Sequence, residues 1–169
     1  AAKLGDNSGV LFFPNWVDVD FVKPGCSGDL FRQLWGIPTQ TKVVLYAGNL
    51  GKKQGLEIVL NAAQVLKDWD DVVFAFVGAG AAAEDLQNMA SAMALGNVRF
   101  FPLQPYERLP ELMALADVHL VVQRRGAADA VLPSKLTTIL AAGGNALITA
   151  EADTELGKLC ERHPGIARR

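Results

Sequence analysis

The sequence predicts an α/β protein, a Rossmann-like parallel sheet with helices on both faces, and two observations support this fold class. From Lys42 onward, short runs rich in β-branched residues alternate with longer segments in which apolar residues recur every three or four positions. The short runs are continuously apolar, as is typical of strands buried on both faces of a parallel sheet. The five predicted strands cover residues 43–47, 72–77, 98–101, 118–122 and 146–148.

Helices are predicted between these strands. Their expected ranges are 56–67, 82–95, 109–116, 134–142 and 154–162, and a shorter helix at 29–35 precedes the first strand. Ser134 and Thr154 stand at helix starts, where a hydroxyl can accept a backbone N–H, so we expect them to be N-caps. Gly96 and Gly143 follow predicted helices and are expected to cap the carboxyl ends.

The first forty residues have a different character. Residues 10–13 form a short apolar run that predicts a short strand, and the Pro-Gly and Ser-Gly pairs at 24–25 and 27–28 predict turns. At 169 residues, half of them hydrophobic, the chain has the size of one domain with a well-buried core. No internal repeat is visible, which excludes a solenoid.

Composition and charge narrow the possible functions. A net charge of −2, with acidic and basic residues interspersed, argues against a nucleic-acid partner. Cys26 and Cys160 stand alone in the sequence, without further ligands at metal spacing, which fits a reducing compartment and no structural metal. No apolar run reaches the roughly 18 residues of a membrane span, so we expect a soluble, cytoplasmic domain.

The loop after the first predicted strand is the richest in candidate chemistry. Gly48, Asn49 and Gly51 let backbone amides approach an anion, and Lys52 and Lys53 stand at the entrance of a helix whose amino end is partly positive. This arrangement predicts a cradle for a diphosphate. It is not a Walker A loop, because no Ser or Thr follows the lysine. The alternative is a surface turn with solvated lysines.

The loop after the second predicted strand fits the loose dinucleotide pattern G-x-G-x-x-A. It contains Gly78 and Gly80, which we interpret as a tight turn that also lines the ligand pocket. A nicotinamide site would need an acidic residue about 20 positions further on, but Phe100, Phe101 and Pro102 occupy that place. The sequence therefore disfavours a redox function.

A third candidate segment precedes the predicted helix at 134–142. Pro133, Ser134 and Lys135 could receive a second side of the same diphosphate through free amides, a hydroxyl and an ammonium. The alternative is an ordinary capped helix. His119 lies within a predicted strand and is interpreted as a core histidine, and His163 lies in a polar tail, so neither is a candidate catalytic base.

Three segments, in this order, carry a resemblance to a known family. Residues 13–18 read FPNWVD, residues 46–55 contain the loop GNLGKKQG, and residues 97–104 read NVRFFPLQ. Over nearly the whole chain, this order resembles the carboxy-terminal, donor-binding domain of GT-B glycosyltransferases of family 4. The first segment is similar to the connector that joins the two domains of those enzymes.

The resemblance implies roles for the first loop. In the family, an arginine and a lysine of a G-R-x-x-x-x-K-G loop hold the donor diphosphate. Asn49 and Gln54 stand at those two positions here. Lys52 and Lys53 are the expected substitutes.

It also implies a nucleobase side and a sugar side. The loop after the third strand contacts the base in the family, which makes Leu103 and Gln104 candidates beside Gly78. Family members carry a Glu-x7-Glu pair, but Ala130 and Thr138 replace both carboxylates. The resemblance then assigns Thr138 to the ribose. In place of the first glutamate, Asp129 is the candidate on the sugar side.

At the level of the whole enzyme, the resemblance implies a retaining, metal-independent transferase without a cofactor. Its donor would be a UDP- or GDP-sugar, and its acceptor would be lipid-linked in bacterial surface polysaccharide biosynthesis of the colanic acid type. It would act at the cytoplasmic face of the inner membrane.

The implied division is a connector and first strand at 1–20, followed by the nucleotide-sugar-binding domain at 21–169. An amino-terminal acceptor domain would be absent and the carboxyl end truncated. Such a domain alone is expected to bind the donor without catalysing transfer. Three rival functions stay open: a nucleotide-sugar epimerase of the same architecture, an NAD-binding oxidoreductase domain and a non-enzymatic interaction module.

Overall fold

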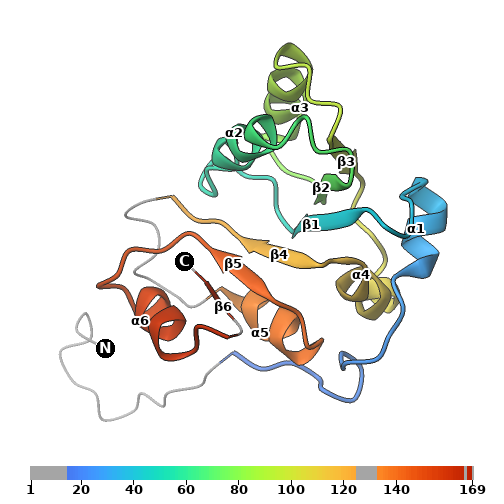
Figure 1. Cartoon of the computed structure of the whole chain (residues 1–169). Helices are drawn as coiled ribbons and strands as arrows, with labels where there is room; N and C mark the ends of the chain where they lie inside the picture. The colour runs from blue at the N-terminus through green and yellow to red at the C-terminus, as the bar shows by residue number, and fades with distance from the viewer. Residues whose placement is uncertain (1–14, 125–132, 166, 169) are drawn as a thin grey trace, which may run out of the picture.

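The computed structural model describes residues 15–124, 133–165, 167 and 168, and the strands in these ranges form one parallel sheet (Figure 1). Their bounds are β1 (Lys42–Ala47), β2 (Val72–Val77), β3 (Val98–Phe101), β4 (Val118–Val121), β5 (Ala146–Ile148) and β6 (Ala167–Arg168). The order across the sheet is β3-β2-β1-β4-β5-β6, and each neighbouring pair is parallel. The predicted parallel sheet is confirmed. Strand β6 was not among the predicted strands, because two residues are too few to give a sequence pattern.

Helices fill the connections between the strands. Their bounds are α1 (Asp29–Trp35), α2 (Glu57–Val65), α3 (Ala83–Ala92), α4 (Leu109–Leu115), α5 (Ser134–Ala141) and α6 (Glu155–Arg162), with a 3-10 turn, η1 (Tyr106–Arg108), before α4. Each predicted helix is present, with ends that differ by a few residues at most. In the part of the chain that the structure describes, no helix has the length and apolar character needed to cross a membrane.

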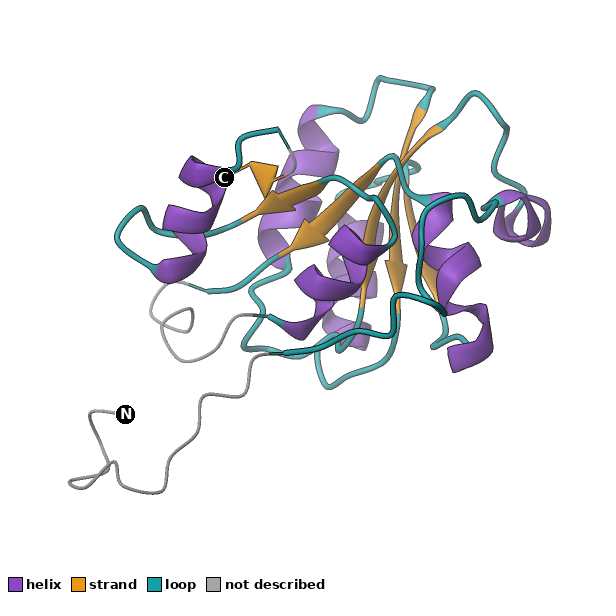
Figure 2. Ribbon diagram, turned by 90° about the horizontal axis from the view of Figure 1, so that it is seen from below, coloured by secondary structure: helices purple, strands orange, loops and turns teal. Residues whose placement is uncertain are grey.

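The helices cover both faces of the sheet, as predicted (Figure 2). Helices α2 and α3 pack on one face, and α1, α4, α5 and α6 supply the core on the other. Because successive side chains of a strand point to opposite faces, Leu45 belongs to the second core and Tyr46 to the first.

Asp117 fixes the start of the central strand β1. Its carboxylate accepts a hydrogen bond from the Val43 N–H at 2.9 Å and one from the Lys42 Nζ at 3.0 Å, and the Arg32 guanidinium lies 3.6 Å away. Partial burial acts to raise the pKa of this carboxyl, but these donors together outweigh burial and hold the pKa below its usual value. The contact joins α1 and β1 to the residue that precedes β4.

Two of the predicted caps are confirmed. The Thr154 hydroxyl accepts the Gly157 N–H at 3.0 Å at the start of α6. Gly143 follows α5 with a φ of 74°, and its N–H donates to the Leu140 carbonyl at 3.0 Å.

The other two caps are wrong. Pro133 occupies the N-cap of α5 with extended backbone, and Ser134 is already the first helical residue. Its hydroxyl therefore makes no cap, and its carbonyl accepts the Thr137 hydroxyl at 2.6 Å. Gly96 is not a cap, because α3 ends at Ala92 and Ala94 turns the chain with a φ of 52°.

The strand order creates a switch point at the centre of the sheet. From β1 the chain proceeds outward to β2 and β3, and then crosses back to place β4 on the other side of β1. In open parallel sheets, ligands bind beyond the carboxyl ends of the strands at such a point. The region after β1 and β4 is therefore the first place to look for a site. The predicted strand at 10–13 lies outside the described residues.

Candidate functional site

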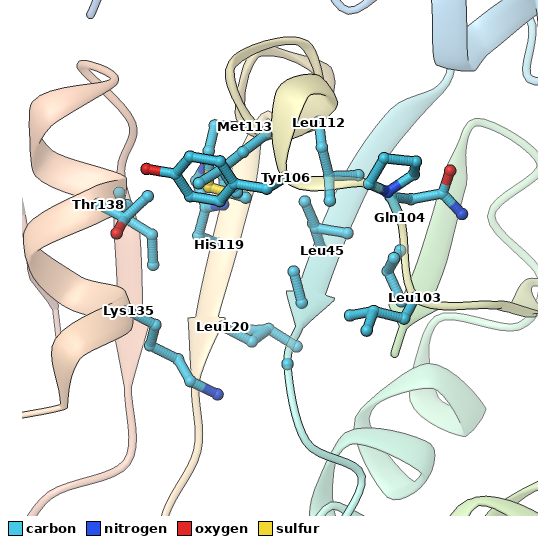
Figure 3. A pocket seen from close by; sticks show the side chains of 16 residues that line it. Leu45, Leu103, Gln104, Tyr106, Leu112, Met113, His119, Leu120, Lys135 and Thr138 are labelled. Atoms are coloured by element: carbon cyan, nitrogen blue, oxygen red, sulfur yellow. The ribbon is translucent and has the colours of Figure 1, made fainter. Parts of the chain in front are cut away.

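A cavity of about 430 Å³ lies at the switch point, between the sheet, α4 and α5 (Figure 3). Most of its side chains are apolar, and the residues that line it come from β1, β2, β4, the loop after β3, η1, α4 and α5. They are Leu45, Ala47, Gly48, Val77, Leu103, Gln104, Pro105, Tyr106, Leu109, Leu112, Met113, His119, Leu120, Lys135, Thr138 and Ile139. An apolar cavity with a few polar groups is typical of a small-molecule site.

Two of the predicted anion-binding segments meet at one edge of this cavity. The Lys135 Nζ lies 3.2 Å from the position that a Cβ on Gly48 would occupy. Gly48 has a φ of 145°, so a glycine suits both its backbone and the close approach of the lysine. The structure thus brings the loop after β1 and the start of α5 together.

The ring of Tyr46 packs against the Lys135 ammonium. The Lys135 Nζ lies 4.0 Å from the centroid of the Tyr46 ring, and the Tyr46 hydroxyl donates to the Asn49 carbonyl at 2.9 Å. Burial raises the pKa of Tyr46 to about 12 and lowers the pKa of Lys135 to about 8. An aromatic face can stabilise an ammonium without neutralising it, so the charge stays available to an anion.

The glycines of the second loop pack under the first loop. A Cβ on Gly78 would overlap the Gly48 carbonyl oxygen, and one on Gly80 would lie 2.5 Å from the Leu50 carbonyl carbon. Gly78 was predicted to line the pocket, but it is not among the residues that line the cavity. It packs against the Gly48 backbone instead. Its contribution is to let two strand-end turns approach each other.

The remaining diphosphate candidates lie outside the cavity lining. They are Asn49, Gly51, Lys52, Lys53, Pro133 and Ser134. Lys52 lies 3.7 Å from Asp85 on α3, and both side chains are largely exposed, so this pair contributes little to stability. Lys53 is also exposed.

The other candidates for the nucleobase and the ribose do line the cavity, whereas Gly78 does not. Leu103 and Gln104 come from the loop after β3, and Thr138 lies one turn beyond Lys135 on α5. The Gln104 Nε2 donates to the Pro102 carbonyl at 2.8 Å, which holds this loop in a fixed shape. Asp129, the candidate on the sugar side, lies outside the described residues.

His119 is both a core residue, as predicted, and part of the cavity wall. It is 2% exposed, and burial lowers its pKa to about 4 although a hydrogen bond to the Met113 backbone acts to raise it. Among the described residues, its Nε2 has no hydrogen-bond partner. The imidazole is neutral near pH 7, so it cannot contribute positive charge to the site.

Sequence reasoning missed three residues near the cavity. No individual role was predicted for Tyr46, Tyr106 or Arg124. The Arg124 Nη2 lies 2.9 Å from the Glu57 Oε1, and its Cγ lies 2.6 Å from the position of a Cβ on Gly55. A guanidinium therefore lies against the loop after β1. Within the described ranges, no group of three or more His, Cys, Asp or Glu residues is placed to hold a metal ion.

Comparison with known proteins gives the family. The sequence matches the family described as Glycosyl transferases group 1 over residues 29–157. It is 54% identical over 160 residues to the colanic acid biosynthesis glycosyl transferase WcaI of Escherichia coli (strain K12), covering 94% of this chain and 39% of WcaI. It is 28% identical over 161 residues to the glycosyltransferase WbjE of Pseudomonas aeruginosa, covering 94% of this chain and 40% of WbjE. The chain thus spans about two fifths of these relatives.

Solved structures agree on the fold. WaaG, a glycosyltransferase involved in lipopolysaccharide biosynthesis, superimposes with a TM-score of 0.66 at 24% identity, over 81% of this chain and 37% of WaaG. Anabaena HepE, determined in complex with UDP-glucose, gives 0.65 at 16% identity over 89% of this chain and 46% of HepE. The fold and its switch-point cavity define a Rossmann-like half of a GT-B glycosyltransferase. The chain belongs to the group 1 glycosyltransferase family and is related to the colanic acid biosynthesis glycosyltransferase.

Proposed function

We propose that this chain is the nucleotide-sugar-binding domain of a retaining glycosyltransferase in bacterial surface polysaccharide biosynthesis. The donor is a UDP- or GDP-sugar, and the enzyme transfers a hexosyl group to a lipid-linked acceptor. The relatedness to WcaI supports the polysaccharide assignment. The complex of HepE with UDP-glucose supports a nucleotide-sugar donor, because the two chains share a fold.

The observation that carries this proposal is the meeting of Lys135 and Gly48 at one edge of an apolar cavity. A nucleotide has an apolar planar base and an anionic diphosphate, and the cavity offers surfaces of both kinds. In this arrangement, the base enters the apolar part beside Leu103 and Gln104. The diphosphate lies over Gly48 and the amino end of α5, whose first N–H groups lack intrahelical acceptors.

Catalysis by this half consists of stabilising the leaving group. As the glycosidic bond breaks, the nucleoside diphosphate gains negative charge, and Lys135 together with the α5 amino end stabilises it. Asn49 and Gln54 replace the cations that the family carries in the first loop. Lys135 therefore supplies the nearest replacement charge, while Lys52 and Lys53 add a more distant, solvent-screened field.

Other parts of the enzyme supply the rest of the reaction. An acceptor-binding domain orients the attacking hydroxyl across a closing cleft, so this chain alone binds the donor but transfers sugar poorly. Diphosphate binding by amides and lysine needs no metal ion. The whole enzyme acts at the cytoplasmic face of the inner membrane, where a lipid-linked acceptor is presented.

Calorimetric titration of the chain with UDP, GDP and ADP tests the proposal. We expect UDP or GDP to bind with a Kd below about 1 mM, a range accessible to calorimetry. The affinity should be equal in EDTA and in magnesium buffer. If none of the three nucleotides binds at millimolar concentration, while circular dichroism shows a folded chain, the assignment is wrong.

A further inference from the structure

Tyr106 is an exposed aromatic residue at the mouth of the cavity. It begins η1, directly after the loop that contains Leu103 and Gln104, and it is among the lining residues. Its relative exposure is 65%, high for a ring beside an apolar cavity. In Figure 3 the Tyr106 ring and the Lys135 amine stand apart, on different parts of the cavity lining.

One face of this ring is already covered. The rings of Phe21 and Tyr106 are stacked, with centroids 4.9 Å apart and planes inclined by 24°. Tyr106 remains 65% exposed despite this contact, so much of its ring surface away from Phe21 is accessible. A stack on one side fixes the plane of the ring, so the accessible surface is presented in a defined orientation.

The segment that carries Phe21 is itself well ordered. The Asp18 Oδ1 accepts the N–H groups of Asp20 at 3.0 Å and Phe21 at 3.1 Å, and the Asp18 carbonyl accepts the Val22 N–H at 2.8 Å. Val22 is 1% exposed and anchors the turn in the protein. Phe21 is therefore held before any ligand arrives, which lowers the entropy cost of ordering the pair on binding.

We propose that Tyr106 is the stacking platform for the nucleobase of the donor and that Phe21 is a positioning residue that holds this platform. The inference rests on the proposed function, because it assigns the base end of the same site. A base is planar and apolar on its faces, and base–aromatic stacking is a common, sequence-tolerant mode of binding. The diphosphate edge at Gly48 and Lys135 leaves the Tyr106 side of the cavity for the base.

A sugar ring fits the Tyr106 side less well. Its hydroxyl groups need several polar partners, whereas most of the residues that line the cavity are apolar, among them Leu103, Pro105, Leu109 and Leu112. The turn at residues 18–22 thus contributes to donor recognition, through a residue about 85 positions from Tyr106 in sequence. No sequence motif links the two residues.

Calorimetry on four chains tests the proposal: the wild type, Tyr106→Leu, Tyr106→Phe and Phe21→Leu, each titrated with the nucleotide that binds the wild type. We expect Tyr106→Leu to weaken binding by roughly ten- to a hundredfold, the loss typical of one base–aromatic stack. Tyr106→Phe keeps the ring and should bind like the wild type. Phe21→Leu should weaken binding by a smaller factor. Thermal unfolding confirms that each variant is folded.

Two further readouts separate stacking from a general structural effect. Inorganic pyrophosphate lacks a base, so its affinity should be equal in the wild type and Tyr106→Leu. Stacking should also lower the ultraviolet absorbance of the bound base in the wild type and Tyr106→Phe, but not in Tyr106→Leu.

The outcomes distinguish this inference from the proposed function. Wild-type affinity in Tyr106→Leu, or a loss in Tyr106→Phe equal to that in Tyr106→Leu, overturns the platform. Unchanged affinity in Phe21→Leu overturns the positioning role. In contrast, failure of the wild type itself to bind any nucleotide overturns the proposed function.

Discussion

The Lys135 ammonium lies over the ring of Tyr46, 4.0 Å from its centroid, and within reach of the Gly48 backbone. This contact joins three features that are far apart in sequence: the end of β1, the glycine turn after it and the first turn of α5. The lysine lies in a largely desolvated setting, where an electrostatic interaction with an anion is stronger than on the surface. Lys135 is therefore a stronger candidate than the exposed lysines for the diphosphate contact proposed above.

The first prediction compares two lysines. Lys135→Met should weaken UDP or GDP binding by about ten- to a hundredfold, because it removes a charge-assisted hydrogen bond worth about 1.5–3 kcal/mol. Lys53→Met removes the same charge from an exposed position, and we expect a loss of about threefold or less, as is usual for screened surface charges. Calorimetry at constant ionic strength measures both. If Lys53→Met loses more affinity than Lys135→Met, the main charge on the diphosphate comes from the loop after β1 and not from Lys135.

The second prediction concerns pH. Burial lowers the pKa of Lys135 to about 8, so the lysine loses its charge as the pH rises through 8, while the terminal phosphate of the ligand is already largely ionised above pH 7. Affinity for UDP or GDP should therefore be constant near pH 7 and fall between about pH 8 and 10, by at most about tenfold per pH unit. In Lys135→Arg the side chain stays charged, and the fall should disappear. An identical pH profile in both proteins would exclude this lysine as its cause.

The fold was predictable because its signals are local. Short continuous apolar runs rich in β-branched residues, such as residues 72–77, are typical of strands buried on both faces, and helical periodicity marks the connections. The predicted helix ends were wrong where tertiary contacts determine where a helix ends. Helix α3 ends at Ala92, and Ala94, with a positive φ, turns the chain so that Leu95 is buried. The local sequence does not show that this turn comes before Gly96.

The residues that line the cavity were predictable only in part, for a similar reason. Gly48 follows β1, and Lys135 and Thr138 lie in the first two turns of α5, at the carboxyl edge of the sheet where the topology places them together. The cavity wall at Tyr106 depends on how η1 and α4 pack, and its stack on Phe21 is a long-range contact without a sequence pattern. The assignment of Lys52 ignored Asp85, because the two residues meet only through the packing of α3 beside the first loop.

The third prediction tests the packing of the two glycine turns. Gly78 has a φ of 147°, and a Cβ there would overlap the Gly48 carbonyl oxygen. Gly78→Ala should lower the free energy of unfolding by about 2 kcal/mol or more. It should also weaken nucleotide binding, because Gly48 must move. Gly96→Ala is the control: a Cβ there meets nothing within 4 Å, and we expect a change within about 0.5 kcal/mol. Urea denaturation measures both, and equal stabilities would show that the turns can separate freely.

The fourth prediction concerns acid stability and His119. Burial lowers its pKa to about 4 in the folded chain from 6.5 in the unfolded chain, so the unfolded chain binds more protons between these values. The contribution of His119 to stability is complete above about pH 6.5 and decreases as the pH falls toward 4, by about 3 kcal/mol in total. Urea denaturation from pH 7 to 4 measures this slope.

Two asparagine variants assign this slope to one histidine. His119→Asn cannot titrate and keeps a donor for the Met113 carbonyl, so it should be less stable at pH 7 but depend less on pH than the wild type. His163→Asn, at an exposed position, should keep the wild-type slope. If His119→Asn loses as much stability at low pH as the wild type, the buried imidazole is not the cause. The loss then comes from carboxylates that accept hydrogen bonds in the folded state, above all Asp117.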